Sequence, residues 1–204
     1  MHQVARTAAW VVSAGISLVI AAGCQGTKPQ PLAQSASAAA PKMAPSNYEF
    51  VAPGTVVVWR DLNSGDLFEE HVKQPNGRMM DSMIGSRRSY AFVPDPWADN
   101  ENTKAADIEP LFPLEVGKQV TFKRNPPAGL ATDVVKVVRT ETLQLAMGPV
   151  DTYVIETRSE IPSDNWVGEA TFWYAPSLKW QVQMVIKDNK GDDRRRQVIE
   201  IKAP

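Results

Sequence analysis

The sequence predicts a mainly β fold: a single antiparallel meander of about 8–10 strands that forms a barrel-like or curled sheet, with little helix outside the N-terminal segment. From Tyr48 onward, apolar and polar residues alternate with period two in short runs, as expected for strands with one buried face. Turn residues separate these runs at hairpin-length intervals, which are too short for the crossover helices of a parallel sheet.

The first 23 residues have the three parts of a secretory signal. Arg6 is the only charged side chain among them, an apolar stretch occupies residues 8–20, and the small residues Ala21-Ala22-Gly23 follow. The apolar stretch is shorter than the roughly 20 residues that a helix needs to cross a bilayer. We therefore expect cleavage here rather than a permanent membrane span.

Cys24, the only cysteine in the chain, stands directly after this segment. Ala21-Ala22-Gly23-Cys24 resembles the lipobox of bacterial lipoproteins, although Ala21 stands where that motif usually has a larger aliphatic residue. The resemblance implies a membrane anchor through acylated Cys24, and Gln25 after it implies the outer membrane, facing the periplasm. The alternatives are a soluble exported protein cleaved after an alanine, or an uncleaved anchor.

Residues 24–47 are rich in Ala, Gln, Ser and Pro and have no periodic apolar face. Such a segment cannot bury enough apolar surface to offset the entropy lost on ordering. The sequence therefore divides into a signal peptide at 1–23, a lipidated cysteine with a disordered tether at 24–47, and a single antiparallel β domain at 48–204.

The strand pattern is clearest at residues 180–187, where Trp180, Val182, Met184 and Ile186 share one face. Turn residues such as Asn63-Ser64-Gly65 separate the other candidates. Further strands are expected at residues 55–60, 67–73, 87–93, 118–123, 133–142, 150–158, 166–174 and 196–201. Residues 93–113 contain four prolines and predict a loop, in which one helical turn could run from Asn102-Thr103 to Ile108.

Three short motifs lie in this part of the chain: FPLEVGK at 112–118, GPVDTYVI at 148–155 and FWYAPSLKW at 172–180. Together they resemble a pattern in exported bacterial β-rich proteins, and they are similar to families described only as domains of unknown function, such as the 3108 group. The resemblance covers about residues 110–187. It implies an antiparallel, barrel-like fold in the cell envelope and brings no catalytic residue with it.

The composition excludes several classes of function. Lys and Arg number 22 against 23 Asp and Glu, so the surplus of positive charge that nucleic acid binding needs is absent. With His2 in the expected signal and Cys24 expected to be acylated, one histidine and no available thiol leave zinc short of ligands, and no glycine-rich phosphate motif is present. The acidic loops at 95–102 and 188–193 do not match a calcium-binding EF-hand. We expect no metal, no cofactor and no nucleic acid.

His71 is the one histidine outside the signal, and in a strand it shares a face with Glu69. This carboxylate-imidazole pair supports one alternative, an envelope hydrolase that uses His71 with an unrecognised Ser or Asp. No G-x-S-x-G nucleophile motif is present, and Cys24 is expected to be acylated. We therefore assign no catalytic residue.

Aromatic residues supply the candidate binding surface. Phe172-Trp173-Tyr174 is apolar on both faces of its strand, so at least one bulky ring points away from the main core unless both faces are covered. Core packing is the alternative. The candidate ligand or partner surface consists of Trp166, Trp173, Tyr174 and Trp180.

The sequence thus predicts a membrane-anchored periplasmic lipoprotein that is not an enzyme. Its β domain is expected to bind an envelope protein or an apolar ligand such as lipid. The alternatives are the His71 hydrolase and a purely structural envelope component.

Overall fold

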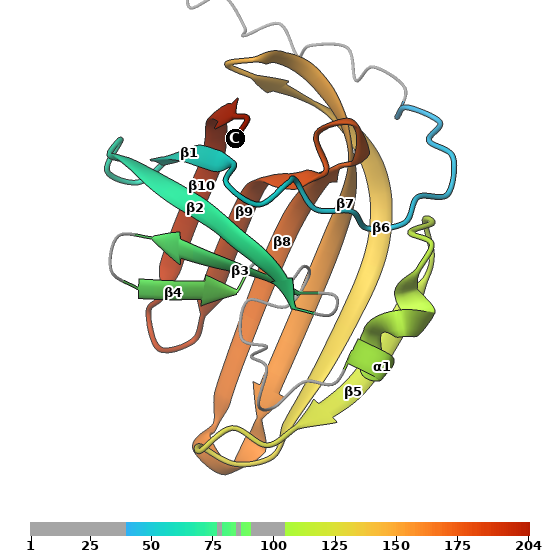
Figure 1. Cartoon of the computed structure of the whole chain (residues 1–204). Helices are drawn as coiled ribbons and strands as arrows, with labels where there is room; N and C mark the ends of the chain where they lie inside the picture. The colour runs from blue at the N-terminus through green and yellow to red at the C-terminus, as the bar shows by residue number, and fades with distance from the viewer. Residues whose placement is uncertain (1–39, 77–78, 85–86, 91–104) are drawn as a thin grey trace, which may run out of the picture. The chain divides into compact units, whose positions relative to one another are not determined.

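The computed structural model of the chain describes residues 40–76, 79–84, 87–90 and 105–204 (Figure 1). Its elements are β1 (Val56–Asp61), β2 (Leu67–Asn76), β3 (Met79–Ile84), β4 (Arg87–Tyr90), α1 (Ala105–Ile108), η1 (Glu109–Leu111), β5 (Gln119–Arg124), β6 (Ala131–Leu145), β7 (Gly148–Ile161), η2 (Pro162–Asp164), β8 (Trp166–Ala175), η3 (Pro176–Leu178), β9 (Trp180–Asp188) and β10 (Asp193–Lys202). No helix in these residues is long and apolar enough to cross a membrane.

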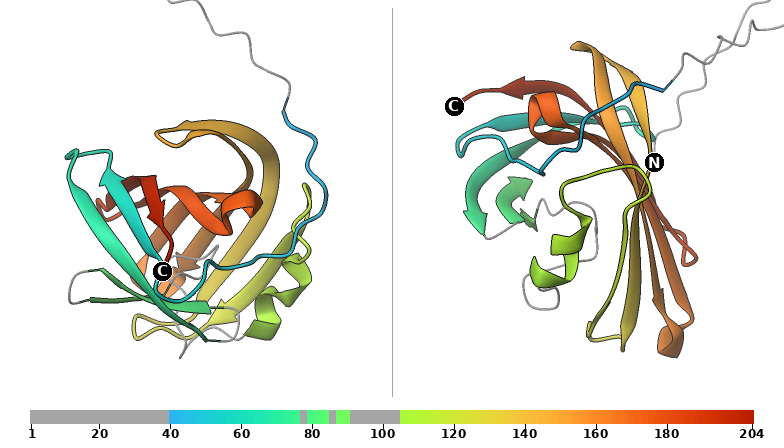
Figure 2. Two further views of the ribbon diagram at one scale, coloured as in Figure 1. Left: turned by 45° about the horizontal axis from the view of Figure 1, so that its top comes forward. Right: turned by 90° about the vertical axis from the view of Figure 1, so that its right-hand side faces the viewer.

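The ten described strands form one antiparallel sheet in the order β4-β3-β2-β1-β10-β9-β8-β7-β6-β5. Each strand pairs with the next strand along the chain, except that β4 does not pair with β5. In addition, β1 pairs with β10. This is the strand order of an up-and-down barrel opened between β4 and β5, and the sheet curls without closing (Figures 1 and 2). The predicted mainly β, antiparallel and curled fold is confirmed.

The expected strands match described strands to within a few residues, but β3 was not predicted. Its sequence, MMDSMI, contains no β-branched residue until Ile84 and has Asp81-Ser82 in the middle, so its local signal is weak. The strand forms because it pairs with β2, with His71 opposite Met83. The predicted helical turn corresponds to α1 and η1, whereas residues 91–104 of the predicted loop lie outside the described residues.

The curled sheet encloses one apolar core. Its largest fully buried side chains include Trp59, Trp180, Phe172 and Ile155, which come from four different strands. α1 and η1 lie beside β5 and add Ile108 and Leu111, both completely buried. The core therefore draws on both halves of the sheet and forms one contiguous cluster.

A segment without regular structure, residues 40–53, crosses the sheet before β1 begins (Figures 1 and 2). We call it the strap. It contacts successive strands in order: Pro41 meets Thr140 of β6, Ala44 meets Tyr153 of β7, Glu49 meets Tyr174 of β8, and Phe50 meets Trp180 of β9. Residues 41–47, which the sequence places in the tether, thus make direct contacts with the sheet.

Aromatic rings fix the last part of the strap. Tyr48 stacks on Tyr174 with ring centroids 4.1 Å apart and planes inclined by 27°. It also meets Phe50 and Phe112 edge to face, at 5.0 Å and 6.2 Å. Aromatic pairs of this kind contribute about 0.5–1.5 kcal/mol each beyond the area they bury. The Tyr48 ring is half-buried, but its hydroxyl is completely buried and has no hydrogen-bond partner.

The unpartnered hydroxyl gives a direct prediction. Tyr48→Phe keeps the ring stack and removes a buried polar group without a partner, so we expect the free energy of unfolding to rise by about 1 kcal/mol. Tyr48→Ala removes the stack and is expected to lower it by about 2 kcal/mol. Denaturant unfolding of both variants checks this, and a Tyr48→Phe protein less stable than the wild type would contradict it.

Tyr48 of the strap and Tyr174 of β8, on which it stacks, also predict a loss of stability in alkali. Burial is the main cause that raises the pKa of Tyr174 to about 12, and burial, followed by nearby Tyr174 and Glu70, raises the pKa of Tyr48 well above its usual value. The unfolded chain ionises its tyrosines near pH 10 while the folded chain keeps these protons. Stability is therefore complete below about pH 10 and falls as the pH rises toward 12.

Phenolate absorbance and unfolding free energy, measured together from pH 9 to 12, check this expectation. Tyr48→Phe and Tyr174→Phe assign the two transitions. If both phenols ionised near pH 10 with no change in stability, the buried contact of the strap would be disproved.

Candidate functional site

The floor beneath the strap is built from the three sequence motifs. FPLEVGK supplies Phe112 and Leu114, GPVDTYVI supplies Tyr153, and FWYAPSLKW supplies Tyr174 and Trp180. All five residues contact the strap through a ring contact, a backbone bridge or a side-chain hydrogen bond. We call this floor the strap groove. The strap groove thus brings residues from three motifs that are distant in sequence onto one surface.

The groove holds the strap mainly by its backbone. The Tyr153 hydroxyl donates to the Ala44 carbonyl at 2.5 Å. The Tyr174 hydroxyl accepts from the Glu49 N–H at 2.8 Å and donates to the Glu49 carbonyl at 3.1 Å. Ser46 and Leu114 exchange two backbone hydrogen bonds, of 3.1 Å and 2.6 Å, as an isolated antiparallel bridge. This geometry recognises an extended peptide by its main chain and places its aromatic side chains against rings.

The structure brings together two of the four predicted surface residues. Tyr174 and Trp180 lie side by side under the strap, and both are fully buried. Trp173 is also buried, and its indole donates to Glu141 at 3.4 Å. Trp166 stands at the opposite end of β8, where it donates to Asp188 at 3.0 Å. A binding role for Tyr174 and Trp180 would require the strap to move.

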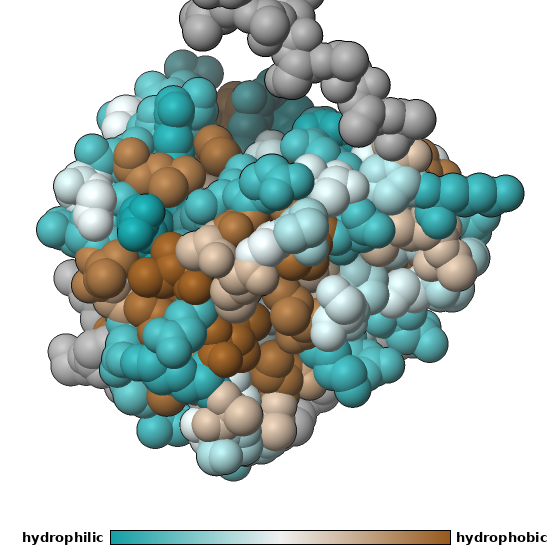
Figure 3. Space-filling model, turned by 90° about the horizontal axis from the view of Figure 1, so that it is seen from above, coloured by the Kyte–Doolittle hydropathy of each residue, from teal (hydrophilic) through white to brown (hydrophobic). Residues whose placement is uncertain are grey.

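An open groove of about 710 Å³ adjoins the strap. Its sides come from the strap, from the facing ends of β6 and β7, and from η3. The lining consists of Met43, Ala44, Pro45, Ser46, Thr142, Pro149, Val150, Asp151, Pro176 and Ser177. Within it Thr142 donates to Asp151 at 2.6 Å. Figure 3 shows that apolar residues gather on the face of the domain seen from above, framed by polar ones.

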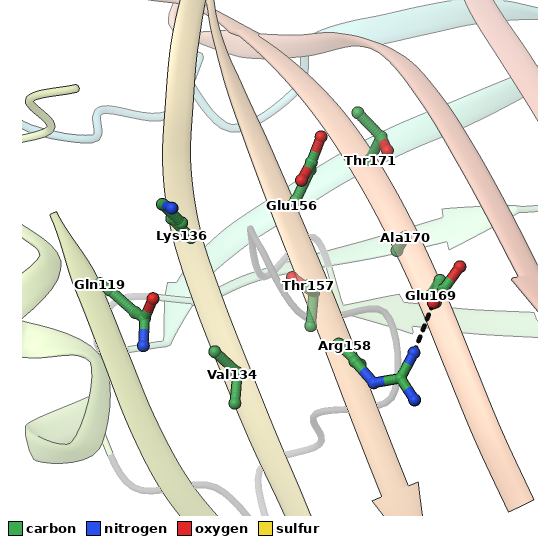
Figure 4. A pocket seen from close by; sticks show the side chains of 9 residues that line it. All are labelled: Gln119, Val134, Lys136, Glu156, Thr157, Arg158, Glu169, Ala170 and Thr171. Carbon is green, nitrogen blue, oxygen red and sulfur yellow. Dashed lines mark hydrogen bonds and ion pairs between the residues drawn. The ribbon is translucent and has the colours of Figure 1, made fainter. Parts of the chain in front are cut away.

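A second depression, of about 400 Å³, lies over β5 to β8 on the face of the sheet opposite the core (Figure 4). Its lining is largely polar, and Arg158 pairs there with Glu169 at 2.6 Å and with Glu160 at 2.8 Å. These exposed ion pairs contribute little free energy, and the Arg158 charge is already paired with the two carboxylates. The depression is therefore the weaker candidate.

The predicted pairing of His71 with Glu69 is confirmed. The His71 Nε2 lies 3.4 Å from a Glu69 carboxylate oxygen, and both side chains are nearly half exposed. Lys202 donates to the same carboxylate at 2.9 Å and is the main cause that lowers the pKa of Glu69. Glu69 thus contacts both His71 and Lys202, and the hydrolase alternative stays a prediction.

The acidic loop at 188–193 is the turn between β9 and β10. Asp188 accepts hydrogen bonds from the Trp166 indole and from the backbone N–H groups of Lys190 and Asp192. These bonds, the Trp166 bond first, lower the pKa of Asp188. Among the described residues no three metal-ligating side chains lie together. The loop at 95–102 and the predicted lipid attachment point Cys24 lie outside the described residues.

One buried ion pair joins β5, β6 and β7. Arg124 donates to Asp133 at 2.8 Å and to Ser159 at 2.9 Å, and all three side chains are buried. The second carboxylate oxygen of Asp133 is buried without a hydrogen-bond partner. A buried pair of this kind ties strands together, since loss of either partner leaves an uncompensated charge.

No protein-family model matches this sequence, and no curated protein matches it. Three solved structures are similar in fold. The hypothetical lipoprotein YmcC from Escherichia coli aligns with a TM-score of 0.47 and 12% identity over 76% of this chain and 92% of its own. A proposed lipoprotein from Parabacteroides distasonis aligns at 0.39 and 12%, over 78% and 100%. A proposed exported protein with a YmcC-like fold from Bacteroides fragilis aligns at 0.38 and 13%, over 76% and 99%. At these scores the likeness supports no inference about function.

Proposed function

We propose that this chain is a lipid-anchored protein of the bacterial cell envelope, attached to the outer membrane through acylated Cys24. Its β domain faces the periplasm and binds an envelope protein or an apolar ligand without catalysing a reaction. The binding site is the open groove beside the strap.

The open groove is the observation that carries this proposal. Its volume of about 710 Å³ lies within the range of ligand sites, and most of its lining is apolar, with Ser46, Thr142, Asp151 and Ser177 as polar groups. It is an open groove rather than an enclosed cavity, and this shape suits a polypeptide segment better than a small molecule. We therefore favour an envelope protein as the occupant.

The position of the groove along the chain supports the same proposal. Strap residues 43–46 form one of its sides, and they belong to the last part of the tether predicted at residues 24–47, so only residues 25–39 separate the strap from Cys24. A flexible tether of about 15 residues has a root-mean-square span of roughly 20 Å. A partner of this groove is thus expected close to the membrane surface.

A photo-cross-linking amino acid at Ser177, which is exposed in the groove, tests the proposal in intact cells. Lys136, exposed in the opposite depression, is the matched control position. We expect an adduct from position 177 and none from position 136, and the mass of the adduct separates a protein from a lipid. No adduct at either position, or equal adducts at both, would contradict binding at the open groove.

The same preparation checks the anchor. The N-terminal peptide of the detergent-extracted chain is expected to begin at Cys24 and to carry the mass of its acyl groups. An unmodified Cys24 in the mature chain would disprove the anchor while leaving the cross-linking result to stand by itself.

A further inference from the structure

The strap does not satisfy all the polar groups of the site that it occupies. On the groove floor the Trp180 indole N–H is buried without a hydrogen-bond partner, and the Tyr48 hydroxyl of the strap itself is likewise buried without one. Trp180 is fully buried on the groove floor and contacts Phe50 of the strap. A buried polar group without a partner costs about 1–3 kcal/mol. The groove thus presents hydrogen-bonding capacity that its resident segment leaves unused.

The strap is also separable from the sheet. Its only β pairing is the isolated bridge between Ser46 and Leu114, so its departure breaks no ladder of the ten strands. It joins β1 through a turn in which Thr55 N–H donates to the Ala52 carbonyl and Gly54 has a φ of 90°. A pivot at this turn frees the strap while β1 keeps its pairing with β10 and β2.

The contacts define what else can occupy the groove. The bonds to Ala44, Ser46 and Glu49 involve the main chain, so they accept any extended segment. The ring contacts require two aromatic residues two positions apart, as in Tyr48 and Phe50. Between them, the Glu49 carboxylate lies 2.7 Å from the exposed Lys179 amine. This exposed pair adds little affinity, but it favours an acidic residue over a basic one.

We propose that the strap groove is a peptide-binding site whose resident occupant is the strap. An extended segment of an envelope protein, with the pattern aromatic-acidic-aromatic, replaces the strap there. This inference rests on the proposed binding function and deepens it, since it names the chemistry of the partner and a second, deeper site beside the open groove.

The strap and the partner segment compete for the same groove. A covalently joined segment on a short linker has an effective concentration in the millimolar range, so the strap holds the groove against weak competitors. A segment that accepts a hydrogen bond from the Trp180 indole makes an interaction that the strap lacks. Binding is therefore expected to be selective for such segments, and weakening of the strap is expected to increase it.

The test uses the full mature chain in detergent and a labelled peptide with the strap sequence, APKMAPSNYEFV, residues 40–51. Fluorescence anisotropy gives its affinity for wild type, Tyr48→Phe and Tyr48→Ala. Because Tyr48→Ala loosens the strap and Tyr48→Phe tightens it, we expect affinity to fall in the order Tyr48→Ala, wild type, Tyr48→Phe. The first step should be about tenfold or more.

Two controls separate exchange from general destabilisation. Phe68→Ala removes a half-buried ring of β2, over which the Arg196 guanidinium of β10 lies. Because this ring is not among the strap contacts described above, its removal should not increase peptide binding. A peptide with both aromatic residues replaced by Ala should bind at least tenfold more weakly than the strap sequence. Equal binding of the two peptides would overturn the proposed specificity.

A folded Tyr48→Ala chain that binds no peptide would overturn the proposal and make the strap a fixed part of the fold. Should Tyr48→Ala fail to fold, Phe50→Ala loosens the strap at Trp180 and decides the question in the same way. The two functional proposals fail separately. An adduct at Ser177 without peptide binding would support a partner in the open groove and disprove exchange of the strap. Peptide binding without an adduct would support peptide exchange in the strap groove and disprove binding at the open groove.

Discussion

Tyr48 stacked on Tyr174 joins the start of the folded chain to its C-terminal half, and the neighbouring contact of Glu49 with Tyr174 spans 125 positions in the sequence. A sheet that curls without closing must cover its apolar face by some other element. Here the strap contacts β6 to β9 one strand at a time and covers Tyr174 and Trp180 of the FWYAPSLKW motif. The open groove exists only because the strap forms one of its sides.

With the lipid anchor that we propose at Cys24, this arrangement places the strap between the anchor and the proposed binding site. Any force transmitted along residues 25–39 would reach Pro41 and Ala44 before it reaches a strand of the sheet. The strap is held by a few backbone hydrogen bonds and by ring contacts, whereas β1 is paired on both sides. Segments with few buried contacts open at lower free energy than the sheet around them. The strap is therefore the element through which the proposed attachment and the proposed binding would influence each other.

Period-two alternation predicted most strands because one face of each is buried, so apolar and polar residues alternate in the sequence. β3 shows little sequence signal, since methionine, aspartate and serine have no strong strand preference. It forms because β2 supplies its pairing. The strap was missed for a different reason: main-chain hydrogen bonds leave no periodic pattern, and its only sequence signal was the alternation of Tyr48 and Phe50. Tyr174 and Trp180 were found as candidates, but their burial depends on a segment distant in sequence. Trp166 belongs to a separate hydrogen bond with Asp188.

Native-state hydrogen exchange tests most directly whether the strap is a separable occupant. The probes are the Glu49 amide, which donates to the Tyr174 hydroxyl, and the Ser46 amide, which donates to Leu114; amides of β7 and β8 report the sheet. Our account predicts that the two strap amides exchange through a local opening at a free energy well below that of global unfolding, and that Tyr48→Phe slows them. Exchange of both amides only through global unfolding, at the same free energy as the sheet, would contradict it.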